Sequence, residues 1–208
     1  MVKLKYNTSV DNVFFTSDTH FYHNNIIKYC NRPFKSVEDM NEIIIRNWNR
    51  VVGPDDYVFH LGDFCFAGSD KWKEIVSRLN GHIILIKGNH DHISKPMESL
   101  FDHVSYQMSI EINKEKVYLN HYPFLTYAGP YKKTPVYQLF GHVHTKKDMT
   151  GKDKGRLTLL FNTQYDVGVD NNNYTPVSWE EVKLRIDEQC KKKKSLKTRI
   201  INWMIKYL

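Results

Sequence analysis

Short apolar runs alternate with helix-like patterns along most of the chain. Runs rich in Val, Ile, Leu and aromatic residues, bounded by Gly, Asn or Asp, are typical of buried strands. We expect the pair 104–112 and 116–120, joined at Asn113-Lys114, to be antiparallel. The runs predicted as strands are 12–17, 56–61, 82–87, 104–112, 116–120, 136–140 and 157–162.

Helices are predicted between these runs. Ser36 followed by Asp39 is an N-cap with an acidic residue three positions on, and it predicts a helix that ends near Val51, before Gly53-Pro54. Strands that alternate with helices predict an α/β domain. The other predicted helices are 24–30, 71–79 and a last one capped by Ser178, with Glu181 at its third position.

The composition narrows the classes of protein. With 208 residues, 41% hydrophobic and 25% charged, the chain is expected to fold around a sizeable core. No apolar run approaches the ~20 residues of a membrane span, and the first residues lack the apolar core of a signal peptide. Three widely spaced cysteines, an odd number, favour a reduced, cytoplasmic location over a disulfide framework.

The net charge of +7 is concentrated at the C-terminus. From Lys183 onward there are nine Lys and Arg residues and two acidic ones, and the first 182 residues carry 21 of each sign. The predicted organisation is therefore a domain at 1–182 and a basic amphipathic helical tail at 183–208. Three interpretations of the tail stay open: it packs on the domain, it contacts an anionic surface such as a membrane or nucleic acid, or it pairs with a second copy.

Polar residues follow five of the apolar runs. In an open α/β sheet, ligands bind outside the strand ends, where the loops converge. A single D-x-H triplet is common by chance, and His60, His82 and His103 are more simply core or solvated side chains. It is the ordered recurrence that indicates a site, and the recurring donors are Asp18, His20, Asp63, Asn89, His121, His142 and His144.

These donors are seven oxygen and nitrogen ligands. One transition ion takes about four to six ligands, so seven donors with one shared carboxylate suit two ions. Two ions about 3.5–4 Å apart suit an in-line displacement at phosphorus.

In this order, the motifs Asp18-Thr19-His20, Gly62-Asp63, Gly88-Asn89-His90-Asp91, His121 and Gly141-His142-Val143-His144 resemble the calcineurin-like metallophosphoesterase family. The segment after the first motif is similar to a subset of small bacterial and phage phosphoesterases. The resemblance implies a four-layer αββα sandwich of two mixed β-sheets flanked by helices. It also implies two divalent metal ions, Mn(2+) above all, with Fe, Zn, Ni or Co as alternatives.

The resemblance further implies a role for each motif residue. Asp63 would bridge the ions, and a metal-bridging hydroxide would be the nucleophile. His90 would be the general acid, and Asp91 would orient its imidazole and raise its pKa. The first ion would be held by Asp18, His20, Asp63 and His144, and the second by Asp63, Asn89, His121 and His142.

The chain departs from the family pattern after Gly62-Asp63. Many relatives have an arginine there that clamps phosphate, and here the sequence is GDFCFAG. Another group must then steady the phosphate, or the substrate carries less charge. We expect His23 or Asn24 to do so, although Asn24 is also a plain helix cap. Asp170, before three Asn residues, is most simply a turn residue.

The expected function is hydrolysis of phosphate esters, with diesters of nucleotide or nucleic-acid type favoured because few long insertions separate the motifs. The alternatives are a phosphomonoesterase that acts on proteins or nucleotides, and a non-catalytic metal-binding scaffold for a protein partner. Such scaffolds usually lose ligands, and all seven positions are occupied here. The oligomeric state is not indicated by the sequence.

Overall fold

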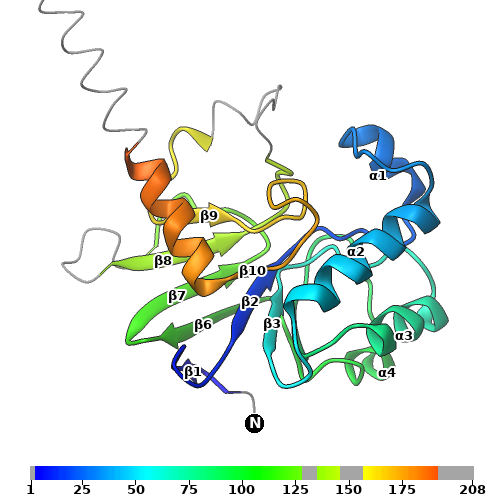
Figure 1. Ribbon diagram of the computed structural model, residues 1–208, viewed down its shortest axis with the longest axis horizontal. Coiled ribbons are helices and arrows are strands. Elements are labelled where there is room, and N and C mark those ends of the chain that lie inside the picture. Colours follow the sequence, from blue (N-terminus) through cyan, green and yellow to red (C-terminus); the bar gives the residue numbers. More distant parts are fainter. Residues whose placement is uncertain (1–2, 128–134, 146–156, 192–208) are drawn as a thin grey trace, which may run out of the picture.

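The computed structural model describes residues 3–127, 135–145 and 157–191, and its strands form two five-stranded sheets (Figure 1). The first sheet has the order β10-β2-β3-β4-β5, and the second β1-β6-β7-β8-β9. Both are mixed: β10 runs antiparallel to β2, and β6 antiparallel to β7, while the other pairs are parallel. The expected sandwich of two mixed sheets flanked by helices is confirmed.

The strands of the first sheet are β2 (Val13–Thr16), β3 (Tyr57–His60), β4 (His82–Ile86), β5 (His103–Ser105) and β10 (Val177–Ser178). Those of the second are β1 (Lys5–Tyr6), β6 (Gln107–Ile112), β7 (Glu115–Asn120), β8 (Val136–Phe140) and β9 (Gln164–Asp166). The four labelled helices are α1 (Asn24–Tyr29), α2 (Val37–Val51), α3 (Ser69–Arg78) and α4 (Lys95–Glu98). A further helix is described over 179–191.

Helix α2 begins as the sequence predicts. The Ser36 side chain accepts a hydrogen bond from the Asp39 N–H at 3.2 Å, which satisfies one of the free donors of the first turn. Met40, Ile44 and Trp48 recur at helical spacing and are fully buried against the outer face of the first sheet. Helices α1–α4 all lie on this side of the molecule (Figure 1).

The main core lies between the two sheets. Alternate residues of β2, β3 and β4 face those of β6, β7 and β8, as the period of a strand requires. The helix over 179–191 adds Trp179, Val182 and Ile186 to this core. Its start is the one predicted, because Ser178 Oγ accepts a hydrogen bond from the Glu181 N–H at 3.2 Å.

The prediction of one strand over 104–112 is wrong. The chain leaves the first sheet after β5 and enters the second at β6, with the exposed Tyr106 between them. Val104, Met108 and Ile110 keep the same two-residue alternation on both sides of this change of sheet. The alternating pattern therefore did not reveal that the chain passes from one sheet to the other. Of the two parts of the predicted strand, β6 pairs with β7, whereas β5 pairs with β4.

The predicted strand at 157–162 is also wrong. Leu157 is helical, the residues after it form turns and a bend, and β9 begins at Gln164. The strand thus begins two residues after the predicted range. In this position Tyr165 lies opposite Leu139 on β8 and is buried in the core.

In the part of the chain that the structure describes, Cys30, Cys65 and Cys190 form no disulfide bond. In the part of the chain that the structure describes, no helix is long and apolar enough to cross a membrane.

Candidate metal centre

Five strands, three from the first sheet and two from the second, deliver the predicted donors to one edge. Asp18 and His20 follow β2, Asp63 follows β3 and Asn89 follows β4; His121 follows β7, and His142 and His144 follow β8. Backbone hydrogen bonds connect these loops: Asp18 N–H donates to Gly62 O at 2.9 Å, and Gly141 N–H to His121 O at 2.9 Å. Segments far apart in the sequence therefore meet at the strand ends.

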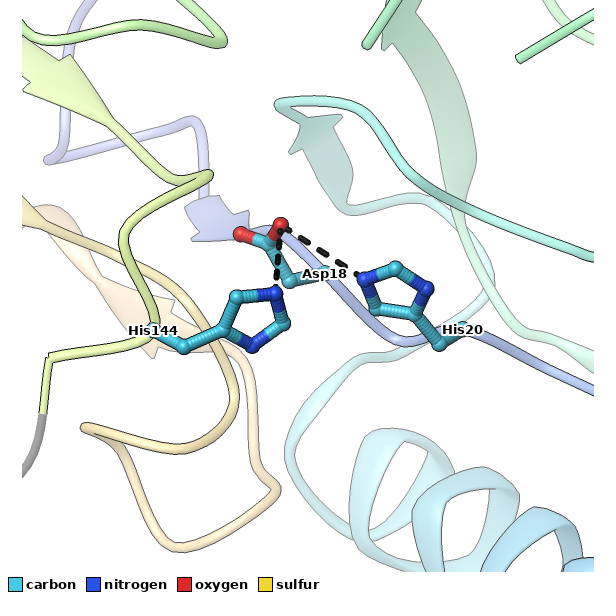
Figure 2. Close-up of side chains that lie close together, drawn as sticks. All are labelled: Asp18, His20 and His144. Carbon is cyan, nitrogen blue, oxygen red and sulfur yellow. Dashed lines mark ion pairs between the residues drawn. The ribbon is translucent and has the colours of Figure 1, made fainter. Parts of the chain in front are cut away.

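Asp18, His20 and His144 form the first group of donors (Figure 2). Asp18 Oδ1 lies 3.9 Å from His20 Nε2 and 3.6 Å from His144 Nε2. Both Asp18 Oδ1 and His20 Nε2 are buried and have no hydrogen-bond partner among the described residues. Buried polar atoms are rarely left unsatisfied, so this pair of atoms fits the ligand positions of a bound cation.

Asp63, His121 and His142 form the second group. Asp63 Oδ2 lies 3.6 Å from His121 Nε2 and also 3.7 Å from His20 Nε2 in the first group. Asn89 Oδ1 is 3.0 Å from His121 Nε2, so the amide faces the same space. One carboxylate oxygen thus lies between the two groups, where a bridging ligand would be.

The electrostatics of the first group call for a positive charge. Burial, followed by the nearby His144 and Arg32, holds the pKa of His20 well below its usual value, so its imidazole is neutral. Burial alone would lower the pKa of His144, but Asp18 and Asp170 outweigh it and raise the pKa to about 11. A cation at this point, whether a proton or a metal ion, is therefore stabilised by the carboxylates.

Left-handed backbone conformations aim several of these side chains. Asp18, His20, Asp63, His142 and His144 all have φ between 45° and 67°. Residues other than glycine adopt this region infrequently, and its cost is about 1–3 kcal/mol each when the surrounding structure enforces it. The first residues beyond β2, β3 and β8 thus turn sharply, which explains why D-x-H and H-x-H triplets direct both of their polar residues into the site.

Two glycines of the motifs are required by close approach. A Cβ on Gly141 would collide with Ser17 Oγ and Asp18 Oδ2, and one on Gly88 would collide with Asp63 Oδ1. The absence of a side chain at each position lets the backbone lie against a candidate ligand carboxylate.

Asp170 was expected to serve a turn, and that expectation missed its main contacts. Its Oδ2 lies 2.7 Å from His144 Nδ1, and its two oxygens accept hydrogen bonds from Arg32 Nε and Nη2 at 2.9 and 2.8 Å. Arg32 also donates to the carbonyl oxygens of Asp18 and Thr19. This buried ion pair fixes the His144 ring and the first motif at once. Its sequence signal, an Arg and an Asp 138 positions apart, is too weak to detect alone.

Two further histidines have fixed orientations. His121 Nδ1 lies 2.7 Å from Leu61 O, so this nitrogen carries the proton and Nε2 faces the site. His60 is a satisfied core residue, as expected: Gly62 N–H donates to its Nδ1 at 3.2 Å, and its Nε2 lies 3.0 Å from Thr19 Oγ1. Burial lowers the pKa of His60 to about 3, which keeps it neutral.

Asp91 differs from its expected role. Its carboxylate accepts backbone hydrogen bonds from Asp63, Phe64 and Gly88 at 2.7–2.9 Å, and the described contacts include none between its side chain and His90. Asp91 therefore holds the second and third motifs together. Burial raises the pKa of the Asp91 carboxyl group, and this effect outweighs the three backbone hydrogen bonds, which lower it.

The two residues predicted to contact phosphate, His23 and Asn24, have different surroundings. The His23 ring stacks on Phe66 with centroids 4.0 Å apart, and its Nδ1 is 3.3 Å from His20 Nδ1. Asn24 is exposed and is the first residue of α1; the N-cap is His23, and no side chain caps the helix. Phe66, in the loop that lacks the arginine, also lies 4.8 Å from the exposed His90 ring. Sequence reasoning did not single out Phe66.

Comparison with known proteins settles the family. Residues 12–163 match the sequence model described as the calcineurin-like phosphoesterase superfamily domain. The chain belongs to this superfamily. As a calcineurin-like phosphoesterase, the protein is a metal-dependent phosphoester hydrolase, and the unsatisfied atoms of Asp18 and His20 fit that metal dependence.

Relatives of this phosphoesterase include an uncharacterised protein of Methanocaldococcus jannaschii, 36% identical over 172 residues, which cover 82% of this chain and 88% of the relative. The gene 66 protein of Mycobacterium phage L5 is 30% identical over 141 residues, 56% of this chain and 65% of the phage protein. A solved structure of a protein of unknown function from Aquifex aeolicus superposes with a TM-score of 0.66 at 28% identity, covering 83% of this chain and 98% of the other. These similarities give the fold and family without a substrate.

Proposed function

We propose that this phosphoesterase uses two divalent ions to hydrolyse phosphodiesters of nucleotide or nucleic-acid type. The first ion is held by Asp18, His20, Asp63 and His144, and the second by Asp63, Asn89, His121 and His142. The observation that carries this proposal is the position of Asp63 Oδ2, 3.7 Å from His20 Nε2 and 3.6 Å from His121 Nε2. An oxygen so placed suits a shared ligand of two adjacent ions.

When bound, such ions supply positive charge that lowers the pKa of water and offsets the charge of phosphate oxygens. We assign the proton transfer to the leaving group to His90. Its imidazole is exposed, and its backbone N–H donates to Asp63 Oδ1 at 3.0 Å, which fixes its loop against the centre. We assign a phosphate contact to His23 rather than Asn24, because the His23 ring lies beside His20 and Phe66.

The preference for a diester rests on charge. A phosphodiester carries one negative charge fewer than a fully ionised monoester, and no arginine follows Asp63 in the GDFCFAG loop. The alternative is a phosphomonoesterase, in which the two ions and His23 would bear the extra charge.

Manganese is the metal we propose, with iron, zinc, nickel and cobalt as alternatives. The donors of the two groups are carboxylate oxygens and imidazole nitrogens. Carboxylates suit manganese, and imidazoles suit iron, nickel and zinc.

Chelation and restoration of metal test the activity. We expect a chelator to abolish hydrolysis of bis(p-nitrophenyl) phosphate and Mn(2+) to restore it, with p-nitrophenyl phosphate a poorer substrate. Metal at a hundredfold excess over its Kd stabilises a fold by about 2.7 kcal/mol, which predicts a rise in Tm of roughly 5–10 °C.

Three results would contradict the proposal. Activity that survives chelation with less than one metal equivalent per chain would exclude the metal mechanism, and a preferred monoester would favour the phosphatase alternative. Metal binding without turnover of either substrate would favour the non-catalytic scaffold.

The domain boundary proposed at residue 182 falls inside the helix over 179–191, and Ile186 beyond it is buried in the main core. The remaining tail, 192–208, lies outside the described residues. We propose that these residues contact an anionic surface, since they contain six basic residues and no acidic one. Deleting 192–208 should leave turnover of small substrates intact and reduce salt-sensitive binding to RNA or anionic vesicles. Unchanged binding, or insoluble protein, would favour packing on the domain.

A further inference from the structure

A cavity of about 550 Å³ opens beside the second group of donors. Its lining includes Tyr122, Leu125, Leu157 and Leu159, and His142 belongs both to the cavity and to the second group of donors. A molecule in this cavity therefore contacts the side chain of a proposed metal ligand. The cavity lies within the usual volume range of a small-molecule site and is much larger than a phosphate group requires.

Tyr122 lines the cavity and also contacts two proposed ligands of the second ion. Its hydroxyl donates to Asn89 Oδ1 at 3.2 Å, and its ring packs edge-on against His142 with centroids 4.6 Å apart. Its backbone is held as well, because Tyr122 N–H donates to Asn120 Oδ1 at 2.8 Å and its carbonyl accepts from Gln138 Nε2 at 3.3 Å. The ring thus has a fixed position relative to two proposed ligands of the second ion.

The described lining is apolar apart from His142 and the Tyr122 hydroxyl, and it contains no Asp, Glu, Lys or Arg. Leu125 and Leu159 are 78% and 69% exposed, which leaves apolar surface in water next to a polar centre. Such surface favours an uncharged aromatic or apolar group over a second phosphate or a charged chain. His90 lies on Phe66, and none of its described contacts is with a residue of this cavity. The leaving group, which His90 would protonate, is therefore assigned elsewhere.

We propose that this cavity binds the organic substituent that stays on phosphorus, and that this substituent is an aromatic group of nucleobase or aryl type. The proposal rests on the phosphodiesterase function above and names the class of its substrate. It makes Leu125, Leu159 and Tyr122 determinants of specificity. A phosphodiester with an aromatic retained group is then preferred to one with a small alkyl group.

Two diesters with the same leaving group isolate this effect. Bis(p-nitrophenyl) phosphate and methyl p-nitrophenyl phosphate both release p-nitrophenolate, and they differ in the group that stays. We expect Leu159→Asp and Leu125→Asp each to lower the ratio of kcat/KM for the aryl over the methyl diester about tenfold relative to wild type. The matched control is Val10→Asp, another exposed apolar residue, outside the cavity, which should leave the ratio unchanged.

Calorimetry with phenylphosphonate and methylphosphonate gives a readout without turnover. Wild type should bind the phenyl compound more tightly, and Leu159→Asp should remove this advantage. An unchanged ratio of kcat/KM in both variants would overturn the proposal. If that unchanged ratio came from an equal loss on both diesters together with a lowered Tm, the leucine side chains would serve the stability of the fold and not the substrate. Failure of wild type to hydrolyse either diester with Mn(2+) would refute the phosphodiesterase function, and phenylphosphonate binding would still test the cavity.

Discussion

Asp63→Asn is expected to lower turnover of bis(p-nitrophenyl) phosphate roughly a thousandfold or more. The charge stabilisation that ions give a phosphoryl transition state amounts to several kcal/mol, and each 1.36 kcal/mol is about tenfold in rate. The substitution removes the negative charge at Asp63 Oδ2, an oxygen that lies within 3.7 Å of Nε2 of both His20 and His121. Bound metal should fall from two equivalents to one or fewer.

The fold should survive this change, so the loss can be attributed to the centre. Asparagine has the same shape, and its Oδ1 can still accept the His90 N–H that Asp63 Oδ1 now accepts at 3.0 Å. Asp55→Asn is the matched control, because Asp55 is an exposed acid in the turn before β3. Activity and metal content measured together decide the outcome: a variant with two ions and full turnover would exclude a bridging role for Asp63.

The motif residues were predictable because each follows an apolar run. A buried strand and the polar residue after it are adjacent in sequence, so Asp18, Asp63 and His121 could be assigned to strand ends without a structure. The parallel neighbours β2, β3 and β4 then carry the first motifs to one edge. The capping of α2 by Ser36 was also predictable, because Ser36 and its hydrogen-bond partner Asp39 are only three residues apart in the sequence.

Contacts between distant residues were not predictable in the same way. Arg32 and Asp170 are each unremarkable locally, and their pairing with His144 depends on how two sheets pack. Asp91 looked like a partner of its neighbour His90, but the turn after β4 directs its carboxylate to the backbone of the Asp63 loop. Sequence adjacency suggested the wrong partner because the turn at 89–90 separates the side chains of neighbouring residues.

The strand errors have one physical origin. Alternation of apolar and polar residues reports that one face is buried, and it does not report which sheet buries that face. The alternation passes through Tyr106 unchanged although β5 and β6 belong to different sheets. The apolar residues at 157–162 do not form a strand; Leu157 and Leu159 instead line the cavity next to His142. The misassigned segment thus supplies one of the residues, Leu159, to which we assign substrate specificity.

His90→Asn is expected to slow turnover while both ions remain bound. General acid catalysis contributes about 10²–10⁴-fold, and the loss should lie in that range for a diester whose leaving group is an alkoxide. The loss should be smaller for a p-nitrophenyl ester, because p-nitrophenolate leaves readily without a proton. Metal content should be unchanged, since the His90 ring belongs to neither donor group among the described residues.

His92→Asn is the control for this variant, because His92 is another exposed histidine two positions along the same loop. His142→Asn provides the contrast, since it removes a donor of the second group and should lower both metal content and turnover. Loss of metal from His90→Asn would show that this imidazole is a ligand rather than an acid. An equal loss on good and poor leaving groups would indicate that His90 positions the phosphate, because proton donation matters most where the leaving oxygen is most basic.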